Sequence, residues 1–305
     1  MNILITGASG FVGRHLEPEL ELRGHKVTSV RSTDFDKIWW FTEKFDAIVH
    51  LAVKTAAGGY CQNHPGEQFI VNSSINADVM AYWAQYQRQA KMITFGSSCC
   101  YDKDSIKIEE NYLKGEPEPG YEVYGYNKRN LLIGLRALKK EYMMEYNYLI
   151  PSVFYGPNYN IDDKHFIFDL IRKIVDAKKG GPDVTLWGDG NQTRELIFIE
   201  DAVNIIIESI EGRRNTEMFN LSTGKEYSIK KYAQTICNIV GYDFNKIKWD
   251  LDAFVGSKNK NLVNTHLKDY NFTPIQEGLE DTIDYYNMMT KNKNTKIWEK
   301  KNLKN

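Results

Sequence analysis

Short apolar runs alternate with longer amphipathic stretches over the first half of the chain. The runs cover residues 2–6, 26–30, 46–52, 91–97 and 146–154, and stretches with a helical pattern such as NSSINADVMAYWAQYQ lie between them. Alternating strands and helices are typical of a parallel sheet with helices on both faces. The pattern therefore predicts an α/β fold with a Rossmann-type doubly wound parallel sheet, in which ligands bind at the carboxyl ends of the strands.

The pattern changes in the second half of the chain, where turn-rich pieces carry short strands and helices. Such a pattern predicts a smaller α+β lobe. The strand-to-helix pattern of LIFIEDAVNIIIESIEG indicates that the chain returns to the first lobe there. We therefore expect a dinucleotide-binding domain over 1–154, rejoined by about 196–214. The remaining segments, 155–195 and 215–305, are expected to form the substrate-binding lobe.

Composition narrows the class of ligand. The chain has 305 residues, 42% of them hydrophobic, and a formal net charge of -1, so it can bury a large core and lacks the basic surplus of a nucleic-acid-binding protein. It has no apolar run of about 18 residues that would cross a bilayer, and its first residues enter a strand at once. We expect a cytoplasmic protein with a small-molecule ligand and no membrane or nucleic-acid partner.

Cysteines and histidines do not indicate a disulfide framework or a metal site. The four cysteines lack C-x-x-C spacing, and the six histidines are scattered, without acids at ligand spacing. The thiols are therefore expected to be free, and no metal is predicted. The cysteines are Cys61, Cys99, Cys100 and Cys237.

A glycine-rich turn follows the first predicted strand directly, in ITGASGFVGRHL. Gly7, Gly10 and Gly13 allow a tight turn and a close approach to a pyrophosphate, and the helix that follows directs its free N–H groups toward it. Glycines at this spacing also arise for packing reasons alone. Their position between the first strand and the first helix favours a dinucleotide site.

The end of the second predicted strand indicates which dinucleotide is bound. A carboxylate there would bind the ribose 2′-hydroxyl of NAD, but this chain has Arg31 and Ser32, with Asp34 further on. An arginine favours a 2′-phosphate, so NADP(H) is predicted in preference to NAD(H). The alternative is that Arg31 is an ordinary solvated charge at a strand end.

Two groups of polar residues suggest chemistry at the carboxyl edge of the sheet. The stretch TFGSSCCYDK ends a buried strand and places Ser97 and Cys99 at this edge. Tyr124 and Lys128 lie four residues apart in a helical pattern, so they share a face, and the ammonium would lower the pKa of the phenol toward neutrality. In a chain with 19 tyrosines such a pair is common, and its value lies in following the glycine-rich turn and the serine.

These motifs resemble the extended short-chain dehydrogenase/reductases, which carry G-x-x-G-x-x-G, a serine after the fourth strand and Y-x-x-x-K. Within this family the chain is most similar to the GDP-L-fucose synthase group, through GSSC, a histidine before an amphipathic helix, and LWGDGNQTRE. The resemblance extends over nearly the whole chain. It implies NADPH-dependent reduction of the C4 ketone of a GDP-linked 4-keto sugar, with epimerisation at C3 and C5.

The resemblance also implies catalytic roles for individual residues. Ser97, Tyr124 and Lys128 would form the reductase triad, Cys99 would be the epimerisation base and His165 the acid. The chemistry is coherent, because a C4 ketone acidifies the C–H bonds at C3 and C5, and the serine and the phenol would stabilise the resulting enolate. Taken singly, Cys99 could be a small buried filler, and a histidine such as His165 more often flanks a helix than serves as an acid.

Binding residues follow from the same resemblance. For the cofactor it implies Gly7, Ser9, Gly10, Phe11, Val12, Gly13, Arg31, Leu51, Ala52, Pro151, Val153 and His165, together with Tyr124 and Lys128. For the nucleotide sugar it implies Ser98, Asn158, Lys173, Trp187, Arg194 and Lys260. It further implies a homodimer through a four-helix contact between NADVMAYWAQYQ and NLLIGLRALKKEY, although these faces could equally pack on the sheet.

The chain departs from the group at several positions. Ser9 stands where an arginine would contact the 2′-phosphate, Val153 where an asparagine is usual, and Lys173 where an arginine would grip a phosphate in bidentate fashion. YGYNK also replaces an Ala-rich segment. Two alternatives therefore stay open: a reductase without epimerase activity on a related GDP-4-keto-6-deoxy sugar or heptose, and, more remotely, a non-catalytic nucleotide-binding protein. A 4,6-dehydratase is disfavoured, because Ser98, Cys99 and Cys100 replace the Asp-Glu pair it needs.

Overall fold

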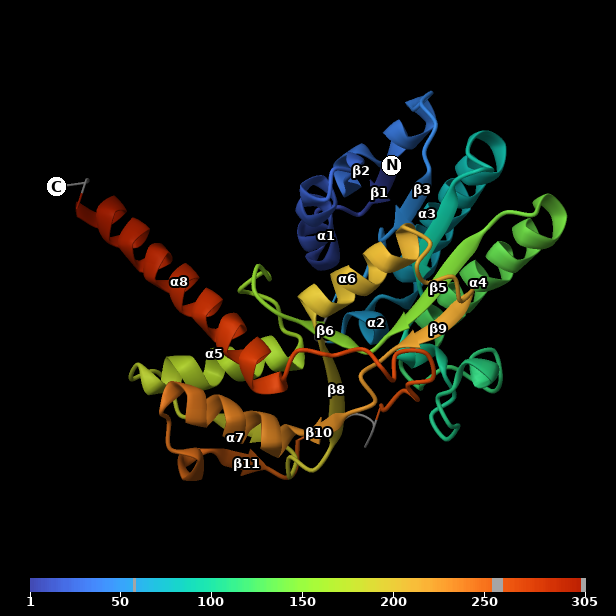
Figure 1. Ribbon diagram of the computed structural model, residues 1–305. Coiled ribbons are helices and arrows are strands. Elements are labelled where there is room, and N and C mark those ends of the chain that lie inside the picture. Colours follow the sequence, from blue (N-terminus) through green and yellow to red (C-terminus); the bar gives the residue numbers. More distant parts are fainter. Residues whose placement is uncertain (57–58, 254–259, 303–305) are drawn as a thin grey trace.

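The computed structural model describes residues 1–56, 59–253 and 260–302, without the side chains of 32–34 and 292–302. Figure 1 shows two lobes, the larger one built on a twisted parallel sheet and the smaller one carrying α5, α7 and the long C-terminal α8.

The sheet of the larger lobe has six parallel strands in the order β2-β1-β3-β4-β5-β9 within the described residues. They are β1 (Asn2–Thr6), β2 (Lys26–Val30), β3 (Ala47–His50), β4 (Lys91–Phe95), β5 (Tyr146–Pro151) and β9 (Met218–Leu221). Each of the predicted apolar runs contains a strand of this sheet, and the last run also contains the first two residues of β6 (Val153–Tyr155). The predicted fold class is confirmed.

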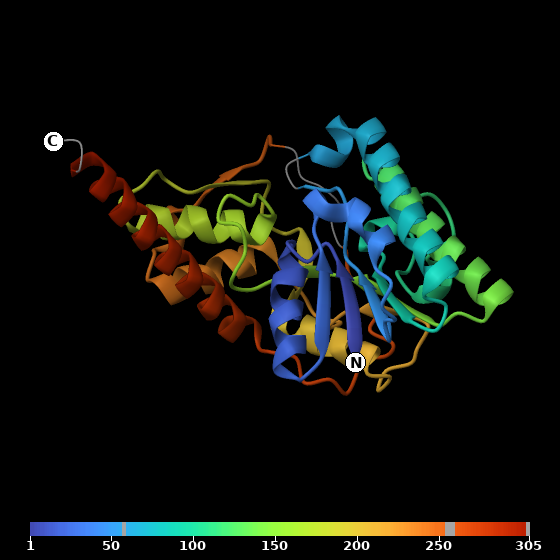
Figure 2. The same ribbon diagram turned by 90° about the horizontal axis from the view of Figure 1, so that it is seen from above.

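Alternate residues of these strands point to opposite faces, and each face is covered by helices. On one face Ile3 and Ile5 pack in a cluster with α1 (Phe11–Leu22) and α6 (Ile199–Ile210). On the other face Leu4 belongs to a cluster with α3 (Pro65–Tyr86) and α4 (Glu122–Tyr142). Figure 2 shows α3 and α4 side by side along the outer surface. Both faces are buried, which is why the strands are nearly continuous in apolar residues.

The order of the strands reverses at β1, because β2 lies on one side of β1 and β3 on the other. In doubly wound sheets the crevice at such a point binds the ligand. The glycine-rich turn follows β1 and therefore lies at this point.

The smaller lobe combines short strands with helices around its own hydrophobic cluster. Its strands form two sheets, β10-β8-β6 and β11-β7, from β6, β7 (Thr185–Trp187), β8 (Thr193–Phe198), β10 (Glu226–Ser228) and β11 (Lys248–Asp250). Its helices are α5 (Phe166–Lys178), α7 (Ile229–Val240) and α8 (Ile275–Asn302). The described part of the whole chain also has short helices in connecting segments. They are α2 (Tyr60–Asn63), η1 (Ser32–Trp40), η2 (Ser98–Cys100), η3 (Glu109–Asn111) and η4 (Phe244–Lys246).

The chain passes between the lobes more than once. It leaves the large sheet after β5, returns from β8 directly into α6, and leaves again after β9. The β9 strand comes from the range 215–305, which the sequence assigned to the smaller lobe, and it pairs with β5. The segment that begins at residue 260 also contacts the larger lobe, because Leu262 and Leu267 are buried in the two hydrophobic clusters of that lobe.

None of the helices in the described ranges is both long enough and apolar enough to cross a membrane.

Candidate active site

The glycine-rich turn packs tightly between β1 and the segment after β3. Gly7 has a φ of +76°, and a Cβ there would lie 2.6 Å from the backbone nitrogen of Ala52. A Cβ at Gly13 would lie 2.5 Å from the carbonyl oxygen of Ala8. Only glycine is tolerated at these approaches. The turn thus packs directly against the segment after β3 and leads into the start of α1.

The first turn of α1 offers unpaired backbone donors. Gly10 is its N-cap residue and has no side chain that could cap the helix. The first N–H groups of the helix and its positive dipole end therefore stay available to a ligand at the point where the strand order reverses. Ser9 is exposed at the tip of the turn. This cradle fits the pyrophosphate of a dinucleotide.

The other predicted cofactor residues surround this turn. Phe11 and Val12 pack partly buried on the core, and the Phe11 ring lies 5.8 Å from that of Phe168 on α5, centroid to centroid. Leu51 donates its backbone N–H to Thr6 at 3.0 Å, which holds the end of β3 beside the turn.

Three further cofactor residues lie at strand ends. Arg31 is exposed directly after β2, whereas the side chains of Ser32 and Asp34 lie outside the described residues. Pro151 ends β5 and Val153 begins β6, so both lie where the chain leaves the large sheet.

The serine predicted for the reductase triad lies two residues after the end of β4. Ser97 is the N-cap of η2, and its Oγ accepts a hydrogen bond from the backbone N–H of Cys99 at 3.2 Å. Ser98 is partly buried beside it. The Ser97 hydroxyl and the Cys99 thiol are therefore held on one short turn.

Tyr124 and Lys128 share a face of α4, as predicted, and the Lys128 Nζ lies 5.9 Å from the centroid of the Tyr124 ring. The predicted lowering of the phenol pKa is wrong for this structure. Burial raises the pKa of Tyr124, with the neighbouring thiols of Cys100 and Cys99 adding to it. Burial also lowers the pKa of Lys128, to about 8. Tyr124 is therefore a protonated phenol at neutral pH, which suits a proton donor.

The thiol of Cys99 lies beside an ion pair. The Lys260 Nζ is 3.8 Å from the Cys99 Sγ and 2.8 Å from the Glu118 Oε2. Arg194 lies on β8 with its pKa lowered by burial, and Glu118 and Cys99 are among the groups that oppose this. The predicted residues Cys99, Arg194 and Lys260 are thus brought together from three segments of the chain.

Three of the predicted sugar-binding residues lie elsewhere in the smaller lobe. Lys173 pairs with Asp169 on α5, with 2.9 Å between the Lys173 Nζ and the carboxylate. Trp187 ends β7 with 61% of its surface exposed. Asn158 is exposed in the left-handed region, with a φ of +53°. Each is available to a ligand, but the described contacts do not join them to Cys99.

His165, the predicted acid, is the N-cap residue of α5 and is exposed. Its Nδ1 lies 2.5 Å from the Asp163 carboxylate, which orients the imidazole. Within the described part of the chain, no hydrogen bond joins His165 to Ser97, Cys99 or Tyr124. The described contacts link Cys99 to Lys260 and link His165 to Asp163.

Residues 3–222 match the model of the NAD dependent epimerase/dehydratase family. The chain belongs to this family. The resemblance found in the sequence is thereby confirmed, and the chain is an enzyme that depends on a nicotinamide cofactor.

Similar proteins match nearly the whole chain. A GDP-L-fucose synthase of Dictyostelium discoideum is 29% identical over 93% of this chain and 94% of its own length. A GDP-L-colitose synthase of Yersinia pseudotuberculosis is 27% identical over 94% and 98%. A GDP-6-OMe-4-keto-L-xylo-heptose reductase from C. jejuni shares the fold with a TM-score of 0.82 at 18% identity, covering 94% of this chain and 98% of that one.

Sequence reasoning missed two carboxylates near the predicted site residues. Glu118 lies in the turn-rich PEPG stretch and carries no motif of its own. Glu195 is buried, and its carboxylate accepts hydrogen bonds from Ser222, Thr223 and Leu262, among others. The available signal was the apolar sequence LIFI after Glu195, which marks a buried strand with an acid at its start.

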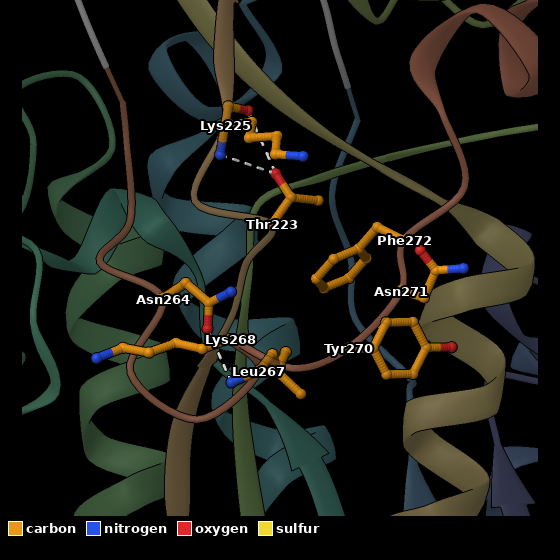
Figure 3. Close-up of a pocket in the computed structure, with 8 residues that line it drawn as sticks. All are labelled: Thr223, Lys225, Asn264, Leu267, Lys268, Tyr270, Asn271 and Phe272. Atoms are coloured by element: carbon orange, nitrogen blue, oxygen red, sulfur yellow. Dashed lines mark hydrogen bonds between the residues drawn. The ribbon is translucent and has the colours of Figure 1, made fainter.

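A small cavity of about 130 Å³ lies next to the loop that holds Glu195, because Thr223, a donor to Glu195, is part of its lining (Figure 3). Its lining comes from the loop after β9 and from the segment before α8: Thr223, Lys225, Asn264, Leu267, Lys268, Tyr270, Asn271 and Phe272. None of the sequence-predicted site residues lines it.

Proposed function

We propose that this chain uses NADPH to reduce the C4 ketone of a GDP-linked 4-keto sugar, after epimerisation at C3 and C5. The observation that carries the proposal is the turn at the end of β4, where the Ser97 hydroxyl and the Cys99 thiol lie together with a cation beside the thiol. Relatives named for GDP-L-fucose and GDP-L-colitose synthesis support the substrate class.

In the reductive step, Ser97 and Tyr124 bind the C4 oxygen of the sugar. The nicotinamide, when bound, supplies the hydride that C4 accepts. Tyr124 gives its proton to the oxygen, because burial keeps the phenol protonated. The Lys128 ammonium stands by the ring and balances the negative charge that the phenol acquires.

In the epimerisation, the Cys99 thiolate removes the proton from the carbon next to the ketone, and the enolate oxygen is held by Ser97 and Tyr124. His165 returns a proton from the other side, with Asp163 orienting its ring. The exposure of His165, whose Nδ1 lies against Asp163, favours a second candidate: a reductase that leaves C3 and C5 unchanged.

The preference for NADP(H) rests on Arg31. It is exposed directly after β2, where the 2′ position of the adenosine ribose lies in doubly wound folds, and its charge suits a phosphate. A GDP-L-fucose synthetase structure from Naegleria fowleri with NADP bound shares the fold, with a TM-score of 0.78 at 20% identity.

The test is to incubate the enzyme with GDP-4-keto-6-deoxy-mannose and NADPH in D₂O and analyse the product by NMR. We expect a reduced sugar with deuterium at C3 and C5, and loss of that deuterium in Cys99→Ser but not in Cys237→Ser, whose thiol is buried in the smaller lobe. A reduced sugar without deuterium would establish the reductase without epimerase activity. Absence of NADPH oxidation with any GDP-4-keto sugar would contradict the proposal.

The rate of reduction should depend on pH through the ionisation of the Lys128 ammonium. Its folded pKa of about 8 lies below the ordinary value, so the ammonium is charged below pH 8 and is lost as the pH rises through 8. We expect kcat/KM, which reports ionisations of the free enzyme, to fall above about pH 8. A profile that stays flat to pH 10 would show that the charge of Lys128 does not contribute.

We also propose a homodimer through α3 and α4. Phe69 and Ile70 on α3 are 52% and 68% exposed, and Ile133 on α4 is 52% exposed. Such apolar side chains on two adjacent helices suit a four-helix contact between two copies. A solution mass of twice the 35.3 kDa chain is expected by light scattering.

A further inference from the structure

The Cys99 thiol is in contact with a buried ion pair. Lys260 donates to the Cys99 Sγ at 3.8 Å and forms a salt bridge with Glu118 at 2.8 Å. The side chains of this pair are only 16% and 9% exposed, for Lys260 and Glu118 respectively. Charges that are shielded from water in this way act strongly on a neighbouring ionisable group.

Local packing fixes the position of Glu118. Its backbone N–H donates to the carbonyl oxygen of Cys99 at 3.0 Å, so the carboxylate and the thiol are tied through the main chain. Gly125 on α4 allows this approach, because a Cβ there would lie 2.5 Å from the Cβ of Pro117. The glycine in YGYNK, a departure from the Ala-rich family pattern, thus has a role in placing this carboxylate.

Lys260 is held in place from the opposite side. The Tyr121 ring lies beneath its Nζ, 4.8 Å from the centroid. Two residues on, the backbone N–H of Leu262 donates to the buried Glu195 at 3.3 Å, and Leu262 itself is fully buried. The ammonium is therefore directed at the thiol by a well-anchored segment.

The two charges act on the thiol in opposite directions. Burial raises the pKa of Cys99, Lys260 works to lower it, and Glu118 raises it. A thiolate base at neutral pH needs the cation, because the buried environment alone favours the neutral thiol.

We propose that the Lys260 ammonium stabilises the Cys99 thiolate, and that the Glu118 carboxylate weakens this stabilisation. The two charges together then determine what fraction of Cys99 is thiolate. Both are positioning residues that act through Cys99. The use of the thiolate as a base rests on the proposed function, whereas its ionisation does not. This role differs from a contact with the nucleotide, which the sequence resemblance implies for Lys260.

Other titratable or charged groups also face the thiol. They are Arg194 on β8, Cys61 on α2, Cys100 on η2, and Tyr121 and Tyr124 at the start of α4. The test variants leave all of these unchanged.

The test is the rate of alkylation of Cys99 by iodoacetamide between pH 6 and 10, followed by peptide mass spectrometry, without sugar or cofactor. Cys99 is partly buried, while Cys61, Cys100 and Cys237 are buried. Because Cys99 and Cys100 are neighbours and share a peptide, fragmentation of that peptide assigns the label to one of the two. We expect Lys260→Met to slow alkylation at pH 7.5 about tenfold, since a shift of one pKa unit changes the thiolate fraction tenfold below the pKa. Glu118→Gln should accelerate it several-fold.

Opposite shifts are the decisive result, because loss of structure would move both variants in the same direction. Lys260→Arg should keep the wild-type rate within about threefold, since it keeps the charge. The matched control Lys268→Met removes an exposed lysine of the same segment and should change nothing. If Lys260→Met does not fold by circular dichroism, Lys260→Gln, which removes the same charge, takes its place in the comparison with Glu118→Gln.

Unchanged alkylation midpoints, or midpoints that shift in the same direction in both charge variants, would overturn the proposal. An enzyme inactive on every GDP-4-keto sugar that still shows the opposite shifts would leave this inference standing and overturn the proposed function.

Discussion

Tyr124→Phe is expected to lower the rate of C4 reduction by about three orders of magnitude, within the range typical of a lost general acid. The phenol is partly buried, its pKa is raised by burial, and it stands beside the Lys128 ammonium. Without the hydroxyl, the oxygen at C4 must take its proton from water, which costs about 4 kcal/mol in the barrier for a thousandfold loss. The measurement is NADPH oxidation in a single turnover, so that product release does not mask the chemical step.

Tyr126→Phe is the matched control for this variant. Tyr126 lies on the same helix, is 40% exposed, and donates to Glu116 on the surface. Its loss should leave the rate unchanged. NADPH should also bind Tyr124→Phe with an affinity close to that of the wild type, because the ring remains. A decrease of less than threefold in Tyr124→Phe would show that another group supplies the proton.

Glu195→Leu is expected to lower the free energy of unfolding by at least about 3 kcal/mol, because several buried donors lose their acceptor at once. The carboxylate accepts from Ser222 Oγ at 2.7 Å, from Thr223 Oγ1 at 2.9 Å and from the Gly224 N–H at 3.0 Å, and also from the backbone N–H groups of Thr223 and Leu262. These donors come from the loop after β9 and from the segment that carries Lys260. Urea unfolding followed by circular dichroism measures the loss.

Glu195→Gln separates the hydrogen bonds from the charge. The amide keeps one carbonyl oxygen, so part of the donor set stays satisfied, and we expect a smaller loss than in Glu195→Leu. Equal losses in the two variants would mean that the charge, and not the number of acceptor sites, matters. A stable Glu195→Leu protein would mean that the loop finds other partners.

The larger lobe could be predicted from the sequence because local signals there agree with the global fold. Each of its strands except β9 is an apolar run between helical patterns, and the glycine turn has its own signature, with φ of +76° at Gly7. The end of β4 and the helical spacing of Tyr124 and Lys128 then place the catalytic candidates on known edges of the sheet. These are effects of residues close together in the chain.

What could not be predicted depends on residues far apart in the chain. Glu118 and Lys260 meet only because their segments fold against Cys99 from two sides. The pKa of Tyr124 is set by burial, which outweighs the cation four residues away. The β9 strand is only four residues long and lies in a turn-rich region, so its pairing with β5 had no local signal.

The repeated passage of the chain between the lobes has a consequence for folding. A fragment ending at residue 154 would lack β9, the partner of β5, and would also lack α6, which covers one face of the sheet. Neither lobe is encoded by a contiguous piece of the chain, so neither can be expressed alone as an intact module. The two lobes should instead melt together in a single cooperative transition, and the relative orientation of the cofactor and sugar sites is thereby built into the topology and not left to a flexible linker.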